Sequence, residues 1–577
     1  MTKITPVGID LGTTLSAGAY VGADGATHMI PNAEGDLLTP SVVLFGDDER
    51  VVGRTAWEAA AIEPDRVAEN VKLDMGQGEY HQDILGNRYP PEVIQACILR
   101  QMRADAAAAV GEPFQAVITA PAYFDQAQRK TTADAGAMSG LDVLDIVNEP
   151  TAAALAYGEK LGYLSASGAP SQEMRLLVYD LGGGTFDVTV IELAPGRVRT
   201  LSTDGDVQLG GWDWDLRLAN YAEQCARAER PSLPALTQEE RIGLARAAEQ
   251  SKHRLSVDEQ TTCQFSLGGQ LLNLPITRSA FENMTADLLE RTCFTTRQTL
   301  QAAGLTWDGI DRLVLVGGST RMPAVEAAVR QLSGKVPDQN VSPDQAVARG
   351  AAIFAQHCLN ARGLASTAEQ LHITDVISHS LGIEGLNLET TQPENVTLIP
   401  RNTAVPFSIT KQFVTKEAGQ QTVKVQLLEG ESQLPSQCSQ LAVAAIRNLP
   451  PGLPKGTKIK VTYSFDAAGR VSVNALVPGQ GTSAQIALER IAGLNSEGVD
   501  GWKQVVCSDG GHADMEAAIA DFLLDEPEAK DLPADFLDDQ PAAAPSKSQA
   551  PAVPHGAPQA ASERLKEAQS QKSERNS

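Results

Sequence analysis

The stretch that decides the fold reads LLVYDLGGGTFDVTV and runs from Leu176 to Val190. An apolar run ends at three glycines, and a run with alternating side chains follows, which is typical of two strands joined by a tight turn. Residues without a Cβ atom let backbone N–H groups gather around an anion. Asp180 and Asp187 flank the turn, and Thr185 adds a hydroxyl. The stretch therefore predicts a phosphate cradle with a magnesium ion beside it, held mostly through water.

Two related turns lie far away in the chain. One reads VGIDLGTT and starts at Val7, and the other reads LVLVGGSTR and starts at Leu313. A single glycine turn is usually a plain hairpin, but three strand-then-glycine turns indicate one nucleotide held between two similar lobes. The LLVYDLGGGTFDVTV stretch lacks the Gly-Lys-Ser/Thr ending of a P-loop, so a different kind of phosphate site is expected.

The length and charge of the chain argue against several classes of protein. With 577 residues it is too long for one core, and two or three domains are expected. A formal net charge of −25 argues against sequence-independent nucleic-acid binding and against docking on anionic membranes. The seven cysteines form no C-x-x-C pair, which argues against a zinc site or a disulfide framework. We expect neither a signal peptide nor a membrane span, and hence a cytoplasmic location.

Strand and helix patterns alternate from Val7 to about Gly363, as expected of an α/β domain. A helix is predicted to open within Tyr123–Arg129 and to run through Met138, and further helices are predicted over residues 152–160 and 238–255. Further along the chain, short alternating runs are separated by Gly, Pro or Asp turns. These runs are Val423–Leu428, Lys458–Phe465 and Arg470–Leu476. Their spacing predicts a β-sandwich.

Seven motifs resemble those of the 70-kDa heat-shock chaperones of the DnaK type. In chain order they are Gly8–Ser16, Thr119–Arg129, Asn148–Gly158, Asp180–Val190, Leu209–Asp215, Val314–Pro323 and Pro343–Ala352. The resemblance covers roughly residues 5–490 and implies a multidomain protein. Residues 1–365 are expected to form an actin-like (ribonuclease H-like) two-lobed α/β ATPase domain, followed by a linker at 366–374. An antiparallel β-sandwich substrate-binding domain is expected at 375–492. A short helical remnant at 493–525 and a disordered acidic, Pro- and Ala-rich tail at 526–577 are expected after it.

The same resemblance implies which residues bind ATP or ADP and Mg²⁺ in the cleft between the lobes. Asp10 and Asp180 are expected to orient the metal ion, mainly through water. The residues expected to catalyse hydrolysis are Lys72, Glu149, Asp180, Thr185 and Asp187. Those expected around the phosphates are Asp10, Gly12, Thr13, Thr14, Gly182, Gly183, Gly184, Thr185, Gly210 and Gly211. Those expected around the adenosine are Glu249, Lys252, Ser256, Gly317, Gly318, Ser319, Arg321 and Asp344.

In the second domain, the resemblance implies a channel for an extended apolar peptide. The residues expected to line it are Ile383, Leu386, Ile399, Phe413, Val423 and Val425. The competing interpretation is that at least half of them are ordinary sandwich core. Pro121, Arg129 and Asp375 are expected to relay the nucleotide state between the domains. The implied partners are unfolded or extended apolar peptides, a J-domain cochaperone and a nucleotide exchange factor, with no nucleic acid and no membrane, and the chain is expected to be a monomer.

Several departures from the family pattern modify these expectations. The linker segment Leu371–Asp375 has polar residues at two of its four aliphatic positions, so its docking should bury less apolar area and weaken interdomain coupling. Asp145 stands where the family usually has an arginine that engages J-domains, and Asp125 and Gln126 replace the usual Asn-Asp. We therefore expect a weakened J-domain response. Beyond the sandwich only Met515–Leu524 predicts a helix, so most of the helical lid is missing and peptides should dissociate quickly.

Three functions are compatible with this sequence. The leading one is an ATP-dependent chaperone that binds extended apolar peptides weakly and releases them. The second is an ATP-sensing regulatory or scaffold protein with one dedicated partner, which the altered linker, Asp145 and the missing lid favour. The third, a sugar-type kinase on the same actin-like fold, would leave the peptide-domain resemblance without a role.

Overall fold

The computed structural model describes residues 4–164, 172–338, 340–364, 371–386, 392–415, 417–447, 449, 451–477, 483–490 and 493–522. Residues 1–522 form one compact unit, and residues 523–577 form a second unit that lies outside the described residues. The tail predicted at 526–577 and the domain boundaries therefore stay predictions. Within the described ranges, no helix has both the length and the apolar character needed to cross a bilayer.

The first lobe is built on a mixed sheet with the strand order β3-β2-β1-β8-β9, and β4 pairs with β2. Strand β1 is antiparallel to β2 and parallel to β8. The strands are β1 (Thr5–Asp10), β2 (Leu15–Val21), β3 (Thr27–Ile30), β4 (Thr39–Pro40), β8 (Phe114–Ala120) and β9 (Val143–Asn148). Helices α2 (Pro91–Val110) and α3 (Gln126–Met138) pack against each other beside it.

A small three-stranded sheet with the order β6-β5-β7 packs against α1 and α2 of the same lobe. Its elements are β5 (Val43–Phe45), β6 (Arg50–Val52), α1 (Arg54–Ala59), η1 (Pro64–Arg66), β7 (Val67–Ala68) and η2 (Val71–Asp74). Because η2 directly follows β7, this sheet determines where Lys72 lies.

The second lobe repeats the plan of the first, with the strand order β15-β10-β11-β12-β16. Strand β10 is antiparallel to β11 and parallel to β15. The strands are β10 (Met174–Leu181), β11 (Phe186–Ala194), β12 (Arg197–Asp206), β15 (Arg312–Val316) and β16 (His372–Thr374). The lobe also contains α5 (Gly211–Glu229), α6 (Gln238–Val257), β13 (Gln260–Leu267), β14 (Gln270–Thr277), α7 (Arg278–Met284), α8 (Ala286–Ala302), η3 (Trp307–Gly309), η4 (Gly318–Arg321) and α9 (Pro323–Ser333).

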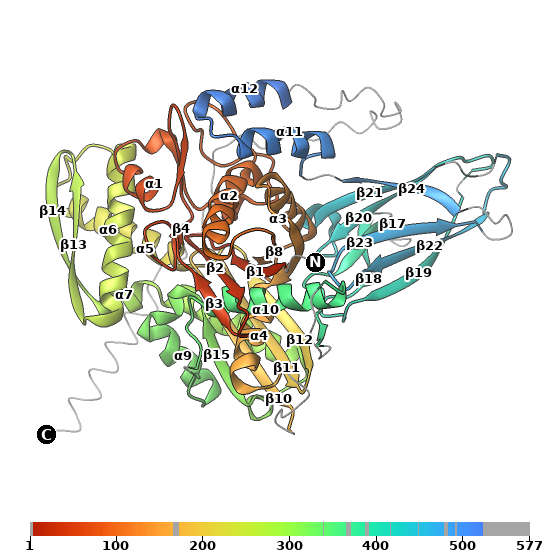
Figure 1. Ribbon diagram of the computed structural model, residues 1–577, viewed down its shortest axis with the longest axis horizontal. Coiled ribbons are helices and arrows are strands. Elements are labelled where there is room, and N and C mark those ends of the chain that lie inside the picture. The colour runs from red at the N-terminus through yellow and green to blue at the C-terminus, as the bar shows by residue number, and fades with distance from the viewer. Residues whose placement is uncertain are drawn as a thin grey trace, which may run out of the picture. The chain divides into compact units, whose positions relative to one another are not determined.

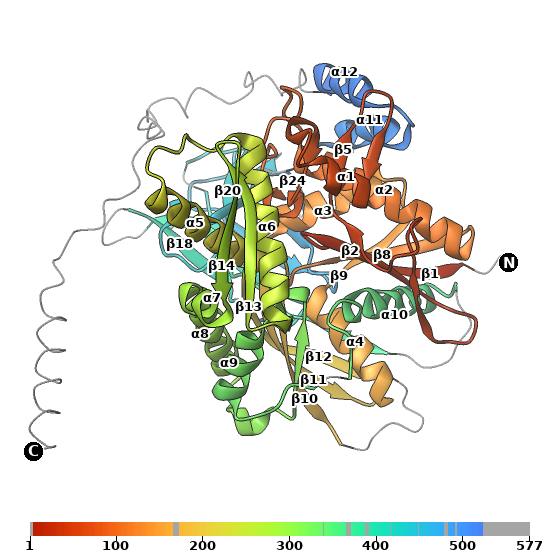
Figure 2. The same ribbon diagram turned by 90° about the vertical axis from the view of Figure 1, so that its left-hand side faces the viewer.

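Helices α4 (Glu149–Leu161) and α10 (Ala346–Ala361) pack against each other between the two large sheets (Figure 2). A Cβ atom on Gly350 would lie 1.7 Å from the carbonyl oxygen of Ala152, and one on Gly8 would lie 2.1 Å from the backbone nitrogen of Ala352. Both positions require glycine, since any side chain would push the helices and β1 apart.

Local capping explains where the predicted helices begin. Asp125 and Gln128 exchange side-chain-to-backbone hydrogen bonds in a capping box, so α3 begins at Gln126, inside the segment predicted to open it, and ends at the predicted Met138. An equivalent capping box starts α6, which runs two residues past its predicted end. Helix α4 begins at Glu149, three residues before the predicted start, because Pro150 has a φ angle that suits a first helical turn.

The predicted β-sandwich is an antiparallel sheet with the order β18-β17-β20-β21-β24-β23-β22-β19 (Figure 1). Its elements are β17 (Leu381–Leu386), β18 (Pro393–Ile399), β19 (Phe407–Val414), β20 (Val423–Glu429), η5 (Pro435–Gln437), β21 (Ser439–Arg447), β22 (Lys458–Phe465), β23 (Val471–Leu476) and β24 (Ser483–Arg490). One buried cluster joins Ile399 and Val425 from one half of the sheet with Val461 and Tyr463 from the other. The two halves therefore fold over a common core.

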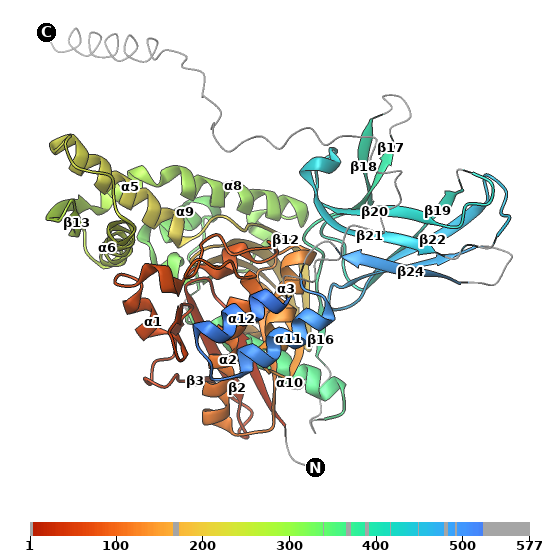
Figure 3. The same ribbon diagram turned by 90° about the horizontal axis from the view of Figure 1, so that it is seen from above.

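Two helices follow the sandwich, α11 (Ser496–Cys507) and α12 (His512–Phe522), where the sequence predicted one at 515–524. Asn495 starts α11 by accepting a hydrogen bond from Gly498 N at 2.7 Å. Figure 3 shows both helices beside α2 and α3 of the first lobe, and α11 contacts both of these helices. The prediction missed α11 because Trp502 and Val506 alone give it a short apolar stripe.

Candidate functional site

The glycine turn between β10 and β11 lies directly against the turn after β1. Gly182 N donates to Thr185 O at 3.0 Å, which closes the glycine turn. A Cβ atom on Gly183 would lie 2.5 Å from Thr14 Oγ1. One on Gly184 would lie 2.7 Å from a side-chain carbon of Thr13. Because side chains are excluded at both glycines, the two turns form one continuous cradle with exposed backbone groups.

Gly210 and Gly211, at the start of α5, support the cradle from behind. A Cβ atom on Gly210 would lie 2.4 Å from the backbone nitrogen of Gly184. Gly211 N donates to Gly182 O at 3.0 Å, and Ser319 Oγ donates to the same oxygen at 2.8 Å. The start of α5 and the helix η4 therefore both fix the shape of the glycine turn.

Buried charges surround the cradle. Lys72 Nζ lies 2.6 Å from Glu149 Oε1, and the two residues are 4% and 6% exposed. Burial, reinforced by the nearby charge of Glu149, raises the pKa of Asp10 and of Asp187 to about 7. The same causes raise the pKa of Asp180. A divalent cation suits such a group of carboxylates, because it offsets both their desolvation and their mutual repulsion.

Hydrogen bonds orient these carboxylates for an ion with water ligands. Thr119 Oγ1 donates to Asp10 Oδ1 at 3.3 Å, and Tyr123 N donates to Asp187 Oδ1 at 2.9 Å. Among the residues that the structure describes, no three ligating side chains converge closely enough to hold a metal ion by themselves. The residues therefore fit magnesium, which usually keeps several waters and binds phosphate oxygens.

A cavity of about 850 Å³ lies between the two lobes above the cradle. Its far wall comes from α6 and η4, where Arg321 pairs with Asp344. Lys252 of α6 pairs with Asp215 at 2.6 Å and donates to Gly211 O at 2.9 Å. The lining of the cavity therefore extends from the glycine cradle to α6 and η4.

The cavity brings together most of the residues predicted to bind the nucleotide. Those that line it are Asp10, Gly12, Thr13, Thr14, Lys72, Glu149, Asp180, Gly182, Gly183, Thr185, Glu249, Lys252, Ser256, Gly317, Gly318, Ser319, Arg321 and Asp344. Four predicted residues are not part of its lining, namely Gly184, Asp187, Gly210 and Gly211. Gly184 belongs to the cradle itself, and Asp187, Gly210 and Gly211 contact the cradle or residues next to it.

Sequence reasoning missed the residues at the mouth of the cavity. The guanidinium of Arg246 lies 4.2 Å from the centre of the Trp57 ring and forms an ion pair with Glu69. This contact joins α6 of the second lobe to the small sheet region of the first. His253 lines the same cavity, and burial lowers its pKa. Arg246 lies three residues before Glu249 on the predicted helix, which was a usable signal, whereas no sequence pattern links Trp57 to it.

The linker extends the sheet of the second lobe. His372, Ile373 and Thr374 pair in parallel with Arg197, Val198 and Arg199 of β12. Leu371, just before them, is 7% exposed. Backbone groups make the ladder bonds, so the two polar linker residues do not prevent docking. The predicted weakening of interdomain coupling stays a prediction.

Asp375 ends the linker and binds the first lobe. Its Oδ2 atom accepts hydrogen bonds from Asn148 Nδ2 at 2.7 Å and from Thr151 Oγ1 at 2.9 Å. Arg129 donates to the same Asn148 side chain. Burial lowers the pKa of the Arg129 guanidinium, while nearby Asp375 opposes this shift. Two of the predicted relay residues therefore meet at Asn148, and the third, Pro121, directly follows β8.

Asp125 and Gln126, two of the departures from the family pattern, contact the β-sandwich. Gln126 N donates to Glu429 Oε2 at 2.9 Å, and its side chain donates to a backbone carbonyl before β23 at 2.9 Å. Ser439 Oγ donates to Asp125 Oδ2 at 3.1 Å. Asp145 lines a cavity of about 450 Å³ formed by the first lobe, the linker and the sandwich, and burial raises its pKa.

The structure separates the residues predicted to line the peptide channel. Ile383, Ile399 and Val425 are at most 7% exposed and belong to the sandwich core. Phe413 and Val423 are only partly buried and pack against the edge of that core. The side chain of Leu386 lies outside the described residues. Three of the six predicted channel positions are thus consistent with the competing interpretation, in which such residues belong to the core of the sandwich.

Comparisons with known proteins agree with this arrangement. The family model described as Hsp70 protein matches residues 6–84 and 79–569. Two curated relatives, each a chaperone protein DnaK from a strain of Halobacterium salinarum, are 39% identical over 513 residues. These residues make up 86% of this chain and 76% of each relative. The chain belongs to the Hsp70 family.

Proposed function

We propose that this chain is an ATP-hydrolysing chaperone that binds and releases extended apolar segments of unfolded proteins. The observation that supports it most is the pairing of two glycine turns around the buried Lys72–Glu149 ion pair. Membership of the Hsp70 family, whose members include ATP-hydrolysing chaperones, supports the same conclusion.

The proposed hydrolysis needs positioning and charge neutralisation more than a strong base. Backbone N–H groups of the cradle and the Thr185 hydroxyl bind the phosphates. Magnesium, held near Asp10 and Asp180 through water, would neutralise phosphate charge. Lys72 places a positive charge beside the terminal phosphate, and its partner Glu149 orients the attacking water together with Asp187. The Arg321 end of the cavity receives the adenosine.

Peptide binding is proposed for the edge of the sandwich core at Phe413 and Val423. Nucleotide control of this region would pass through Asp375 and the Gln126–Glu429 contact, because both join the first lobe to the linker or sandwich. The J-domain response is expected to be weakened by Asp145, and an exchange factor is an expected partner. The cytoplasmic location and the monomeric state stay predictions.

The second candidate is an ATP-sensing regulatory or scaffold protein of the same family with one dedicated partner. The departures at Asp125, Gln126 and Asp145 favour it, because they cluster where the lobe meets the linker and sandwich. The family membership leaves the sugar-type kinase without support.

The deciding experiment measures the dissociation rate of a fluorescent apolar heptapeptide from the full chain with ATP, with ADP and without nucleotide. A chaperone binds many apolar heptapeptides and releases them faster with ATP. If the chain binds only one peptide of a varied panel, and if the dissociation rate is the same with and without ATP, the result would favour the scaffold function. The ADP sample controls for occupancy of the cleft.

A further inference from the structure

The β-sandwich differs in charge from the rest of the chain. Residues 375–492 contain ten Lys or Arg and nine Asp or Glu, although the whole chain has a formal net charge of −25. The bases gather between residues 411 and 460, where there are seven Lys or Arg and three Asp or Glu. One of these acids is Glu417, in the loop between β19 and β20, and the other two, Glu429 and Glu431, lie at or just after the end of β20 that meets the first lobe. The opposite end of β20 is therefore surrounded mainly by bases.

Three lysines lie beside Phe413, which is partly buried at the edge of the sandwich core. Phe413 of β19 pairs with Ile459 of β22, and Lys458 and Lys460 lie on either side of Ile459 (Figure 1). Lys411 is two residues before Phe413 on the same face of β19. One residue along a strand spans about 3.3 Å and neighbouring strands lie about 4.8 Å apart, so the three lysine α-carbons are within about 7 Å of that of Phe413.

The adjoining loops and β20 add two more lysines at the same end of the sandwich. Thr415 N donates to Thr457 O at 3.0 Å, which holds the loop after β19 against the loop before β22. Lys455 lies in the second of these loops, two residues before Thr457, and is exposed. Lys424 directly follows Val423 on β20. Lysines therefore lie around both of the apolar residues to which peptide binding is assigned above.

The positions of these lysines argue against a purely structural role. Within the described ranges, Lys411, Lys455, Lys458 and Lys460 are exposed and form no ion pair. A lysine on an edge strand such as β19 prevents unwanted strand pairing. Strand β22, however, pairs with β19 on one side and with β23 on the other, so Lys458 and Lys460 are not needed for that purpose. Their charge is thus free to attract a ligand.

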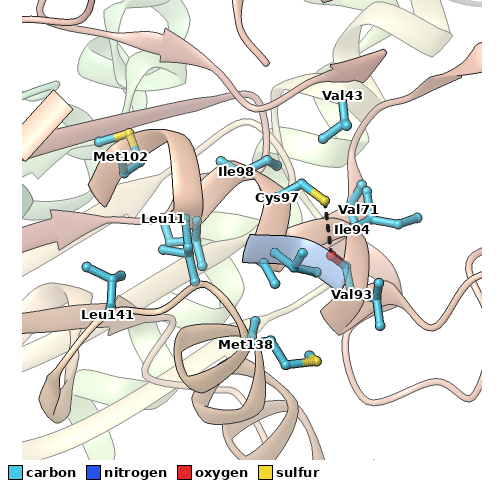
Figure 4. Packing of buried hydrophobic residues seen from close by; sticks show 14 of the residues in the cluster. Leu11, Val43, Val71, Val93, Ile94, Cys97, Ile98, Met102, Met138 and Leu141 are labelled. Carbon is cyan, nitrogen blue, oxygen red and sulfur yellow. Dashed lines mark hydrogen bonds between the residues drawn. The ribbon is translucent and has the colours of Figure 1, made fainter. Parts of the chain in front are cut away.

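Accessible apolar surface accompanies this positive charge. Figure 4 shows the apolar cluster of the first lobe, in which Ile94 and Ile98 are fully buried. In the sandwich cluster, by contrast, Phe413 and Val423 are only partly buried, and Val414, next to Phe413, is 53% exposed. A ligand that matches this end of the sandwich has an apolar centre and negative charge on either side of it.

We propose that the peptide site selects apolar segments flanked by acidic residues. The apolar centre of the segment contacts Phe413 and Val423, and the carboxylates of its flanks lie beside the surrounding lysines. Exposed charges attract each other over a screening length of about 10 Å at 0.1 M salt, so the flanks need not touch the lysines. Such attraction mainly speeds association. This inference rests on the proposed peptide binding and names the class of peptide.

The test measures the affinity of the full chain, with ADP bound, for three fluorescent peptides. They share one apolar heptapeptide core and carry Glu-Glu, Gln-Gln or Lys-Lys on both sides of it. The Glu-flanked peptide should bind about fivefold more tightly than the Gln-flanked peptide, and the Lys-flanked peptide about fivefold more weakly. Raising the salt from about 0.1 M to about 1 M shortens the screening length to about 3 Å and should bring the three affinities together.

A pair of double variants assigns the preference to the lysines. Lys458→Glu/Lys460→Glu should remove the preference for the Glu-flanked peptide, whereas Lys458→Arg/Lys460→Arg, the matched control, should keep it. Both residues alternate with the buried Ile459 and lie on the outer face of β22, so neither double substitution alters the core. The unfolding temperature is measured for both variants. Lys458→Gln/Lys460→Gln replaces the Glu variant if that variant does not fold, and it should lose about half of the preference.

The three peptides also separate this inference from the proposed function. Equal affinities at 0.1 M salt, or tighter binding of the Lys-flanked peptide, would overturn the preference for acidic flanks and leave peptide binding itself in place. A preference that survives Lys458→Glu/Lys460→Glu, or that persists at 1 M salt, would overturn the role of the lysines. Failure of all three peptides to bind would overturn the proposed function, and this inference with it.

Discussion

The nucleotide cleft and the joint between the first lobe and the β-sandwich are built in opposite ways. In the cleft, backbone lies against backbone or threonine, and a Cβ atom on Gly210 would lie only 2.4 Å from the backbone nitrogen of Gly184. At the joint, exchangeable polar side chains make the contacts, such as Gln126 with the backbone before β23 and Asp125 with Ser439. Side chains are therefore excluded at the glycines of the cleft, whereas the joint is held by side chains that a substitution can replace.

The largest effect should come from the buried ion pair in the cleft. Lys72→Ala should slow single-turnover hydrolysis by about a thousandfold, or about 4 kcal/mol, while ATP binding changes by less than about tenfold. Removing the lysine also leaves Glu149 as an unpaired buried charge, which costs stability. The Lys72→Met/Glu149→Gln double variant controls for this, because it should regain stability without regaining hydrolysis. Unchanged hydrolysis in Lys72→Ala would refute the catalytic role.

A smaller effect is expected within β20, where neighbouring inward positions differ in burial. Val423→Phe should reduce apolar-peptide affinity by about tenfold, because it fills the edge of the core, and it should leave the unfolding temperature nearly unchanged. Val425→Phe is the matched comparison, since Val425 is buried and overpacking there costs about 1–3 kcal/mol of stability. Fluorescence titration and calorimetry measure the two effects. Peptide affinity that survives Val423→Phe would show that the channel lies elsewhere.

The joint should depend on pH through Glu429. Burial, reinforced by Asp125 and opposed by Arg129, raises the pKa of Glu429 to about 8 in the docked arrangement. When the domains separate and the carboxyl meets water, its pKa returns toward the ordinary value. The docked form therefore binds more protons, so docking weakens as pH rises toward 8, by at most about tenfold per pH unit. Glu429→Gln should remove this slope in a measurement of ATP-driven peptide release, and a slope that persists would assign it to another group.

The smallest effect should come from one hydrogen bond at the joint. Gln126→Ala removes the side-chain bond to the sandwich and should cost about 1 kcal/mol of docking, or about fivefold in ATP-driven peptide release. The backbone bond from residue 126 to Glu429 remains. Gln264→Ala is the control, because Gln264 makes a similar but exposed side-chain bond on β13. Equal behaviour of the two variants would mean that Gln126 does not couple the domains.

The comparison also explains which parts of the molecule the sequence could predict. The end of α3 at Met138 was predicted, and its start was placed within Tyr123–Arg129, where Asp125 and Gln128 fix it through bonds three residues apart. The glycine turns were predicted because their chemistry is local. Helix α11 was missed because Trp502 is buried by a contact with Tyr89, which lies more than 400 residues away in the sequence.

The same limit applies to the two functional regions. Alternation in β20 shows that Val423 and Val425 face the same side, but burial by the other strands decides which one is core. The contact of Arg246 with Trp57 likewise exists only once α6 meets the first lobe. Most residues predicted for the cleft therefore line one cavity, whereas half of those predicted for the channel lie in the sandwich core, and the binding roles of both sets stay predictions.

Helices α4 and α10 cross in close contact between the two lobes. At Gly350 the helices approach each other through backbone atoms, and small side chains such as Ala153 and Ala351 belong to the core cluster at the same crossing. Glu149 begins α4 three residues before this contact, and Asp344 lies six residues before it on the other helix's side. Any change in the angle between α4 and α10 would therefore alter the distance between Glu149 and Asp344 on the two walls of the cleft.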